Sequence, residues 1–344
     1  MALLTGDILV VNAGSTSLKL SVVDDEEQSR SVASLAEAAP VAAVGHRVVH
    51  GGERFFEPTL IDDDVLAELR RLIELAPLHN TPAVEAIETA RAVLPDVPHV
   101  AVFDTAFHRA LPDVAKTYLL PSRYRERGIR RFGFHGLSVA WCAERVRARR
   151  MVVCHLGGGS SITAVGDGRS VDTTMGFTPL EGVPMATRAG PLDPGSLLYL
   201  LRHGVPLDEL DRALEHESGL TALGGSGDVA SLESDDSRAA RLALDIYCYR
   251  TAQAVAAMAT ALGGLDAVVF TAGVGEHSAH VRAEICRRLA FLGVEIDREA
   301  NTAGDGDREI SAASSRARVH VLAAREDVMV ARAVRDLAGA GSRA

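Results

Sequence analysis

Apolar positions along this chain follow two alternating patterns, short unbroken runs and a helical period. Residues 8–11 form an apolar run typical of a buried strand, and the partly alternating run 18–23 predicts a second strand after a turn that contains glycine and serine. The same pattern returns at residues 151–156 and 161–165, on either side of a glycine-rich turn. We therefore predict two hairpins of one type, which indicates a single structural module used twice.

Apolar side chains three and four residues apart predict helices between these strands. The predicted helices cover residues 62–76, a segment that starts at Thr81, residues 237–262 and residues 278–289. Pro82 suits the first position of its helix, because a proline there loses no helical hydrogen bond. A strand over residues 267–270 follows the long Ala-rich helix. Hairpins mixed with helices favour α/β domains with mixed sheets over an all-parallel sheet.

Composition limits the possible partners. At roughly 150 residues per domain, 344 residues predict about two domains, and 47% hydrophobic with 24% charged residues is typical of a globular protein. The net charge of −10 argues against nucleic acid and membrane surfaces as partners, because both need a basic surface. An anionic ligand would have to be held by a local cluster of donors.

Cysteine use and the N-terminus indicate the compartment. The four cysteines are scattered without a zinc-ligand spacing, which favours a reduced, cytoplasmic protein. No basic region precedes Asp7, so the start of the chain does not resemble a signal peptide. The longest uncharged helical stretch, residues 251–265, is shorter than the ~20 apolar residues that cross a bilayer. We therefore expect a soluble cytoplasmic protein.

Both predicted hairpin turns are rich in hydrogen-bond donors. The first carries Asn12, Ser15, Ser17 and Lys19, and the second carries His155, Gly157, Gly158 and Gly159. Glycine lets the backbone approach phosphate oxygens closely, and hydroxyl groups can donate to them. One such turn alone is explained better by an ordinary tight hairpin, but two of them favour a clamp for a polyphosphate between two domains.

A third glycine cluster, around Gly273 and Gly275, follows the strand 267–270. A strand, a glycine turn and a helix in succession are found in nucleotide sites. The spacing here matches neither GxGxxG nor the P-loop, so a packing turn explains the cluster equally well.

Polar side chains interrupt several apolar or glycine-rich segments. They are His46, Arg47, His79, Asn80, Asp104, His135 and Arg188. Buried charge usually has a partner or a catalytic role, and for each residue alone a structural hydrogen bond is as good an explanation as catalysis. His46 and His50 lack the glutamate of an HExxH motif, so zinc is a poor explanation, and the chain has no GxSxG motif of a serine hydrolase.

Sequence blocks across nearly the whole chain match one family. The sequence resembles the acetate kinase family, with its propionate and butyrate relatives, within the superfamily of acetate and sugar kinases, Hsp70 and actin. The matching blocks are ILVVNAGS at residues 8–15, VGHRVVHGG at 44–52, LAPLHN at 75–80, VFDTAFH at 102–108, FGFHG at 132–136, MGFTPLEG at 175–182 and FTAG at 270–273. So many specific blocks in one order are not expected by chance.

This resemblance implies a duplicated α/β fold, in which two RNase H-like (actin-like ATPase) domains with mixed sheets enclose a cleft. One domain would cover residues 1–108 and 328–344, and the second would cover residues 109–327. The implied reaction is a reversible, in-line transfer of the ATP γ-phosphoryl group to acetate or another short carboxylate, with Mg²⁺ or Mn²⁺. The resemblance also implies a homodimer that forms through the second domain.

The resemblance assigns roles to matching positions. The carboxylate and the moving phosphoryl group would be held by Arg47 and Arg188, and the phosphoryl oxygens would accept from His135. The site would be supported by His79, and Mg²⁺ with its water would be organised by Asn12, Asp104 and Glu326. The pocket for the acyl methyl group would be formed by Val49, Leu78, Phe134 and Pro179. The adenine nucleotide would be contacted by Asp228, Gly273, Val274, Gly275 and His277.

Four positions depart from the family pattern, mostly on the nucleotide side. Asparagines are replaced at Gly158, His277 and Arg325, and an arginine is replaced at Ala230. The segment between residues 24 and 45 is also shorter than in most relatives. These differences leave two alternatives open: a nucleotide-binding protein of this fold that has lost catalysis, and a kinase for another small acid or a sugar.

Overall fold

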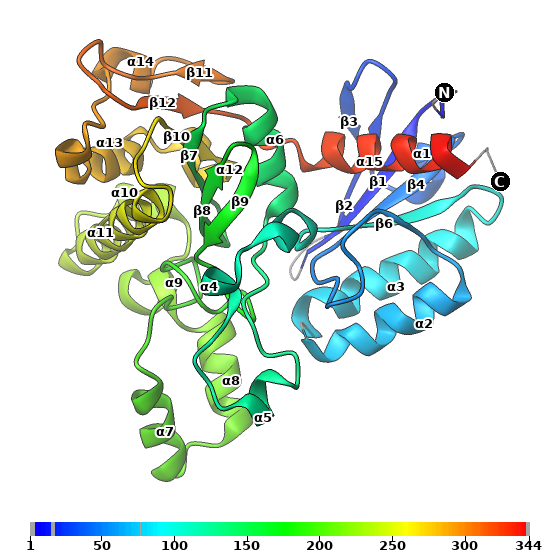
Figure 1. Cartoon of the computed structure of the whole chain (residues 1–344), viewed down its shortest axis with the longest axis horizontal. Coiled ribbons are helices and arrows are strands. Elements are labelled where there is room, and N and C mark those ends of the chain that lie inside the picture. Colours follow the sequence, from blue (N-terminus) through cyan, green and yellow to red (C-terminus); the bar gives the residue numbers. More distant parts are fainter. Residues whose placement is uncertain (1–3, 15–17, 76, 342–344) are drawn as a thin grey trace. The chain divides into compact units, whose positions relative to one another are not determined.

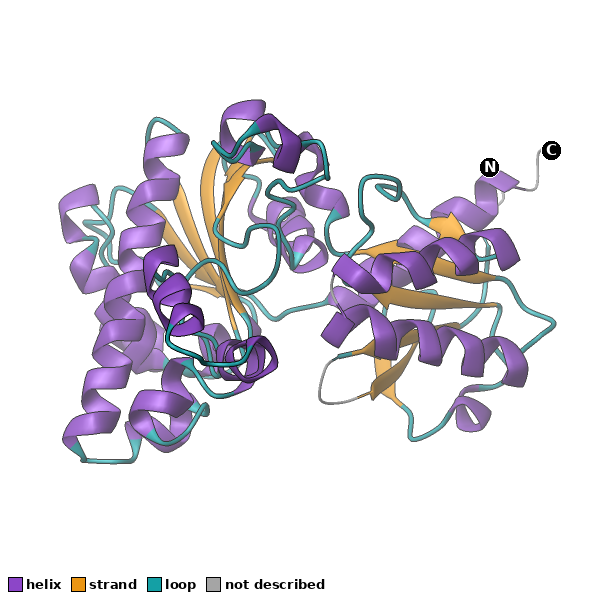
Figure 2. Cartoon of the chain, turned by 90° about the horizontal axis from the view of Figure 1, so that it is seen from below, coloured by secondary structure: helices purple, strands orange, loops and turns teal. Residues whose placement is uncertain are grey.

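The structure, a computed structural model, describes residues 4–14, 18–75 and 77–341. Its chain separates into two compact units (Figure 1). Unit 1 contains Met1–Arg109, Phe134–Trp141 and Arg325–Ala344, and unit 2 contains Ala110–Gly133 and Cys142–Ala324. Each unit has a six-stranded mixed sheet with helices packed on it (Figure 2). The prediction of α/β units with mixed sheets is confirmed.

The sheet of unit 1 has the strand order β3-β2-β1-β4-β6-β5. Its strands are β1 (Ile8–Ala13), β2 (Leu18–Val23), β3 (Ser29–Ser31), β4 (Ala43–Val48), β5 (Thr59–Leu60) and β6 (His99–Phe103). The strands β1, β4 and β6 are parallel, whereas β2, β3 and β5 pair antiparallel with their neighbours. The carboxyl ends of the three parallel strands therefore meet at one edge of the sheet.

Helices pack on both faces of this sheet (Figure 1). They are α1 (Leu35–Ala38), α2 (Asp63–Arg71), the 3₁₀ helix η1 (Leu72–Leu75), α3 (Pro77–Val93), the 3₁₀ helix η2 (Ala106–Ala110), the start of α6 (Gly136–Val146) and α15 (Glu326–Gly341). On one face, Val48 and Phe103 pack with Leu69 of α2. On the other face, a Cβ at Gly45 would lie 2.5 Å from Val330 Cγ1, so the glycine lets α15 approach β4 closely.

The sheet of unit 2 has the strand order β11-β12-β10-β7-β8-β9, which repeats the topology of unit 1. Its strands are β7 (Arg150–Leu156), β8 (Ser160–Gly166), β9 (Arg169–Thr173), β10 (Ala267–Thr271), β11 (Arg308–Glu309) and β12 (Arg318–Val321). In both sheets an antiparallel three-stranded meander is followed by two strands parallel to its first strand and by an antiparallel edge strand. The duplication predicted from the two hairpins is confirmed.

Unit 2 contains twelve helical segments in its described part. They are α4 (Asp113–Lys116), α5 (Ser122–Arg125), the end of α6, α7 (Pro194–Arg202), α8 (Leu207–His216), α9 (Gly219–Gly224), α10 (Val229–Glu233), α11 (Arg238–Ala261), α12 (Ala272–His277), α13 (Ala279–Arg288), the 3₁₀ helix η3 (Ala290–Leu292) and α14 (Arg298–Thr302). Of these, α4, α11 and α12 contact the second sheet directly. The core cluster joins the sheet to α11 and α13, with Phe270, Tyr247 and Ile285 among its buried members. None of the described helices has the length and apolar character that a membrane span requires.

Most local predictions agree with these elements, and two are wrong. Ser237 and Ser278 cap α11 and α13 as expected. The helix α3 begins at Pro77, so Pro82 lies inside it. A proline inside a helix removes one backbone donor and crowds the preceding turn, but α3 continues through it. The predicted turn at residues 271–276 is largely the short helix α12, because a single residue, Ala272 with φ 64°, turns the chain after β10.

Candidate active site

A cluster of polar side chains surrounds Arg47 in unit 1. Arg47 lies on β4, Asn12 occupies the paired position of β1, and Asp104 directly follows β6. Arg47 donates from Nε to Asp104 Oδ1 at 3.1 Å and from Nη1 to Asn12 Oδ1 at 3.0 Å, and its Nη2 donates to Asp104 Oδ2. Glu326, the first residue of α15, places Oε2 3.7 Å from Arg47 Nε. Four predicted site residues therefore meet at the carboxyl edge of the parallel strands.

The charges of this cluster are largely withdrawn from water. The Asp104 side chain is fully buried and that of Arg47 is 13% exposed. Burial by itself lowers the pKa of Arg47, but the carboxylates of Asp104 and Glu326 outweigh that effect and raise it. Burial raises the pKa of Asp104 to about 6, against the attraction of Arg47. Arg47 therefore keeps its positive charge at a site with little water. Its attraction for a bound anion would be screened only weakly there.

The oxygen atoms around Arg47 also suit a hard divalent cation. Asn12 offers an amide oxygen, and Asp104 and Glu326 offer carboxylates, which are ligands that Mg²⁺ prefers. Among the described residues, no group of three or more His, Cys, Asp or Glu side chains could hold a metal ion by itself. This arrangement fits Mg²⁺, which is usually held by one or two carboxylates together with phosphates and water.

His135 has a backbone conformation that residues other than glycine rarely adopt. Its φ is 58°, in the left-handed region, and strain of this kind clusters at functional sites. The adjoining Gly136 donates its N–H to Asp104 O at 2.9 Å, and a Cβ at Gly136 would lie 2.1 Å from that oxygen. The preceding Phe134 is buried. The segment 134–136 is thus fixed against the backbone of Asp104.

The remaining candidates of unit 1 lie near the end of β4 and in α3. Val49 follows β4 and is buried. Leu78 and His79 lie in the first turn of α3; His79 is half-buried, and the Leu78 side chain lies outside the described part of the structure. Asn80 accepts from His50 N and donates to His50 O, each at 3.1 Å. Asn80 therefore ties the start of α3 to the segment that follows β4.

Unit 2 contains a cavity of about 560 Å³ between its glycine clusters. Its lining includes six predicted nucleotide contacts: Gly157, Gly158, Asp228, Gly273, Val274 and His277. A Cβ at Gly158 would have nothing within 4 Å. The Asp228 carboxylate accepts from Ser231 Oγ at 2.6 Å and, as the cap of α10, from Ser231 N at 3.1 Å; these bonds, the hydroxyl bond first, lower the pKa of Asp228. The structure therefore brings the second and third glycine clusters together around one cavity.

Other predicted nucleotide contacts lie outside this lining. Gly159 and Gly275 each adjoin a residue that lines the cavity, and His155 lies two residues before the lining residue Gly157. Lys19 is an exposed residue of β2, paired with Asn12 of β1. Ser15 and Ser17 lie outside the described residues.

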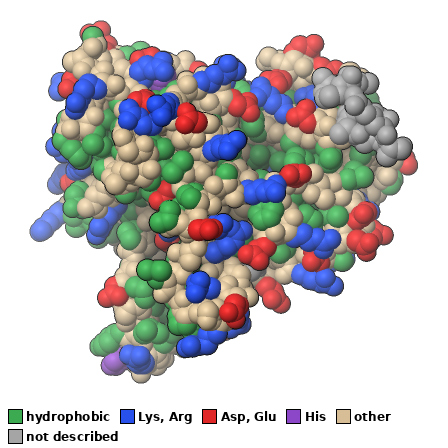
Figure 3. Space-filling model, in the orientation of Figure 1, with side chains coloured by type: hydrophobic (Ala, Val, Ile, Leu, Met, Phe, Trp, Pro, Cys, Tyr) green, Lys and Arg blue, Asp and Glu red, His purple; other side chains and the backbone are tan. Residues whose placement is uncertain are grey.

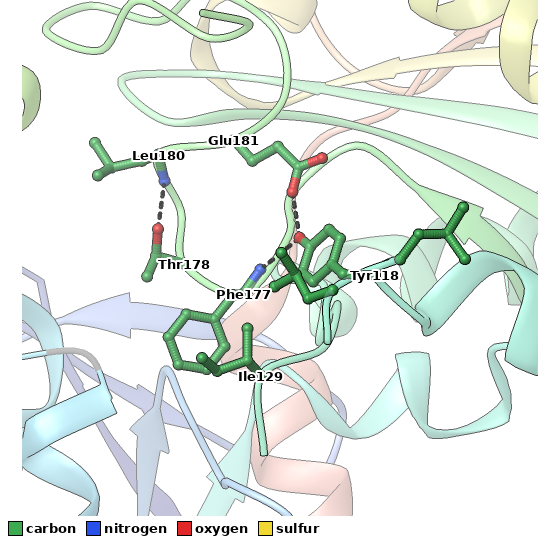
Figure 4. A pocket seen from close by; sticks show the side chains of 8 residues that line it. Tyr118, Ile129, Phe177, Thr178, Leu180 and Glu181 are labelled. Atoms are coloured by element: carbon green, nitrogen blue, oxygen red, sulfur yellow. Dashed lines mark hydrogen bonds between the residues drawn. The ribbon is translucent and has the colours of Figure 1, made fainter. Parts of the chain in front are cut away.

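The loop that carries Pro179 is held by a network of polar side chains beside an apolar pocket of about 450 Å³ (Figure 4). Tyr118 donates its hydroxyl to Glu181 Oε2 and accepts from Phe177 N at 3.0 Å. Arg131 donates to Glu181 Oε1 at 2.6 Å. Burial raises the pKa of Tyr118, so its hydroxyl remains a donor at neutral pH. Pro179 is buried within the loop that this network fixes.

Arg188 lies in the loop between β9 and α7. Its Nε donates to Glu215 Oε2 at 2.9 Å, and each of the two side chains is 12% exposed. Glu215 belongs to α8. Each of the two arginines predicted to bind substrate therefore has a carboxylate partner within its own unit.

Sequence reasoning missed the side chains that hold the predicted ones in place. Glu215 lies 27 residues from Arg188 and looks like any acidic residue of an amphipathic helix. Glu181 gave a signal, since it lies in the block MGFTPLEG, but Tyr118 and Arg131, which bind it, gave none. Such partners are recognised only once the loops are folded together.

Comparisons with known proteins show the family of this chain. A model of the Acetokinase family matches residues 31–332. The chain is 43% identical over 309 residues to an acetate kinase of Protochlamydia amoebophila, covering 87% of this chain and 78% of that protein. It is 47% identical over 312 residues to an acetate kinase of Gloeobacter violaceus, covering 87% and 77%. Among solved structures, a propionate kinase from Francisella tularensis superposes with a TM-score of 0.88 at 33% identity, covering 96% of this chain and 99% of that one.

Proposed function

This chain belongs to the acetokinase family, and from that premise we propose that it transfers the γ-phosphoryl group of ATP to a short-chain carboxylate. Acetate is the first candidate substrate, and the products are an acyl phosphate and ADP. The observation that carries this proposal is the cluster of Arg47 with Asp104, Asn12 and Glu326. Such a cluster offers a fixed cation and hard oxygen ligands at the ends of three adjacent strands.

The chemistry of a carboxylate nucleophile explains why the site needs cations. A short carboxylic acid has a pKa near that of Glu, about 4, so it is ionised at neutral pH and needs no general base. A carboxylate oxygen forms a bond to the γ-phosphorus while the bond from that phosphorus to the β,γ-bridging oxygen breaks, and ADP leaves. Two anions must approach each other in this step, and charge spreads over the equatorial phosphoryl oxygens.

Particular residues would provide that stabilisation. Arg47 and Arg188 would bind the two anions, because a guanidinium fork can grip two oxygens at once. His135 would donate to the phosphoryl oxygens, and His79 would support the site. Bound Mg²⁺, or Mn²⁺ in its place, would supply charge neutralisation of the phosphates, and Asn12, Asp104 and Glu326 would hold it.

The nucleotide and the acyl group would occupy separate surfaces. The cavity beside Gly158 and Gly273 would receive ATP, since glycines let the backbone approach phosphates. Val49, Leu78, Phe134 and Pro179 would form the small apolar pocket for the methyl group of acetate. Propionate is the second candidate, because the superposed Francisella protein is a propionate kinase and one methylene changes binding by only about 1–3 kcal/mol.

A homodimer that forms through unit 2 remains a prediction, as does a cytoplasmic location. The described surface of unit 2 offers exposed apolar side chains for such a contact. Hydrophobic side chains gather around α7 (Figure 3), including Leu198, Tyr199 and Leu201. On α11, Leu242 and Tyr249 are also exposed.

Trapping of the product with hydroxylamine tests the proposed reaction. Purified protein with Mg²⁺-ATP should give a trapped hydroxamate with acetate and, at a different rate, with propionate. Arg188→Ala and His135→Ala should each lower kcat by ~10²-fold, because each removes a contact to the developing charge. The exposed Arg202→Ala is the matched control and should keep kcat. No product with acetate, propionate or butyrate, despite measurable ATP binding, would favour the nucleotide-binding alternative.

A further inference from the structure

We infer that Glu215 is a positioning residue, which fixes the guanidinium group of Arg188 for an anionic substrate and tunes the charge that the substrate meets. This inference rests on the proposed function, in which Arg188 binds the carboxylate or the moving phosphoryl group. Glu215 itself would touch neither substrate. Glu215 lies near the end of α8 and contacts the loop that carries Arg188.

The contact between the two side chains is directional and largely shielded from water. Arg188 Nε lies 2.9 Å from Glu215 Oε2, and both side chains are 12% exposed. Because the contact is made at Nε, it fixes the plane of the guanidinium group, whose two Nη nitrogens carry four of its five N–H donors. An ion pair that is shielded from water holds its geometry better than the exposed pairs on the surface of this protein.

The backbone of the Arg188 loop is fixed by the same region of the chain. Thr187 Oγ1 donates to Glu215 O at 2.7 Å, and Ser218 N donates to Thr187 O at 3.0 Å. At Gly219, which has φ 67°, a Cβ would lie 2.7 Å from Arg188 N. Residues 215–219 therefore fix the main chain at Thr187 and Arg188, and Glu215 also orients the arginine side chain, which these backbone contacts cannot do.

The same loop also touches the cavity assigned to the nucleotide. Ala186 N donates to Gly158 O at 3.2 Å, and Gly158 lines that cavity. A shift of the loop would therefore disturb both the arginine and a glycine turn. Holding the loop rigidly matters, since a misplacement of about 1 Å in a reacting geometry can cost ~10²-fold in rate.

Glu215 should have two separable effects on the reaction. Its oxygen atom orients Arg188, and its negative charge partly neutralises the cation that the substrate must meet. Glu215→Gln keeps an oxygen acceptor and removes the charge, so the KM for acetate should fall by ~3-fold while kcat stays within about twofold. Glu215→Ala removes both, so kcat should fall by ~10-fold.

The experiment compares these two variants with Glu217→Gln. Glu217 lies two residues further along and pairs with Arg212 at 3.0 Å, but both of those side chains are more than half exposed. The KM for acetate, the KM for ATP and kcat are measured by hydroxylamine trapping, and the unfolding midpoint is measured for each variant. Glu217→Gln should match the unaltered protein in both KM values, in kcat and in the unfolding midpoint. Kinetic constants of Glu215→Ala within twofold of the unaltered protein, in a variant with an unchanged midpoint, would overturn the inference, as would identical constants for the Gln and Ala variants.

A spectroscopic measurement separates this inference from the proposed reaction. The ¹H–¹⁵N signal of Arg188 Nε, assigned with Arg188→Lys, should persist in Glu215→Gln and be lost or strongly shifted in Glu215→Ala. An unshifted signal in Glu215→Ala overturns the positioning role, whether or not the protein forms acyl phosphate. Absence of acyl phosphate with the expected changes in the signal would contradict the proposed function alone.

Discussion

The two faces of β4 bury basic side chains that differ in charge: Arg47 is charged on one face, and His46 is neutral on the other. Arg47 meets Asp104 and the Glu326 carboxylate, which outweigh the effect of burial and raise its pKa. The preceding residue, His46, is 1% exposed on the other face, its Nε2 lies 3.0 Å from His99 Nδ1, and burial lowers the pKa of His46 to about 3. Adjacent residues of one strand thus differ in charge because Asp104 and Glu326 outweigh burial at Arg47, whereas burial dominates at His46.

On the face of β4 that carries His46, the donor and acceptor of each histidine hydrogen bond are fixed. His99 Nε2 lies 2.9 Å from Leu94 O, which can only accept, so His99 donates there and its Nδ1 accepts from His46 Nε2 at 3.0 Å. His99 must be neutral for its Nδ1 to accept, and burial keeps His46 neutral as well. The face with carboxylates binds and orients charge, whereas this face contributes only packing and hydrogen bonds.

The largest effect expected from this contrast is a loss of stability in acid. The folded pKa of His46 lies below its unfolded value of 6.5, so the unfolded state binds more protons as pH falls from 6.5 toward 3. Between pH 7 and pH 4 this residue should therefore remove about 3 kcal/mol from the free energy of unfolding. Denaturant unfolding of His46→Gln should show a pH dependence smaller by that amount. The exposed His203→Gln is the control. If the free energy of unfolding depended equally on pH in the unaltered protein, His46→Gln and His203→Gln, a neutral buried His46 would be contradicted.

A smaller effect is expected on the charged face. Arg47→Lys keeps the positive charge but loses the fork that holds Asp104 and Asn12 together. We expect kcat/KM for acetate to fall by ~10²-fold, which corresponds to about 2.7 kcal/mol. Arg70→Lys, at an exposed ion pair with Glu88, serves as the control and should leave the rate unchanged. Retention of more than half of kcat/KM in folded Arg47→Lys would show that the fork is not needed.

The smallest effect is expected at Arg282, a buried arginine of unit 2 that forms no ion pair within 4 Å among the described residues. It is 1% exposed and donates to Asn301 Oδ1 at 2.8 Å, to Asn301 O and to the carbonyls of Gly275 and Glu276. Burial lowers the pKa of Arg282 to about 10, so it still carries charge at neutral pH. Arg282→Met should lower the free energy of unfolding by about 2 kcal/mol, because buried acceptors lose their donor.

Measurements on the folded fraction distinguish Arg282 from Arg47. Acyl phosphate formation by folded Arg282→Met at saturating substrates should stay within about twofold, because the side chain holds α12 and α14 and does not line the cavity assigned to the nucleotide. Arg241→Met, at an exposed ion pair, is the control for the stability change. A kcat loss of ~10²-fold would instead place Arg282 in the chemistry with Arg47.

Local pattern predicted much of this fold. Apolar runs around short turns predicted the hairpins of both sheets, because a strand buried on both faces needs continuous apolar sequence. Capping serines predicted where α11 and α13 begin. Propensity failed at Pro82 and at residues 271–276, where packing and one left-handed residue decided the conformation.

The sequence by itself determined the family, the types of chemical group and the positions of Arg47 and Asp104 in their blocks. Only the tertiary structure decided which groups meet. Asn12, Arg47, Asp104 and Glu326 come from four separate segments, and the parallel order of β1, β4 and β6 with α15 brings them together. Burial and charge depend on those long-range neighbours, which is why adjacent residues such as His46 and Arg47 hold different charges and why Glu215 gave no signal in sequence.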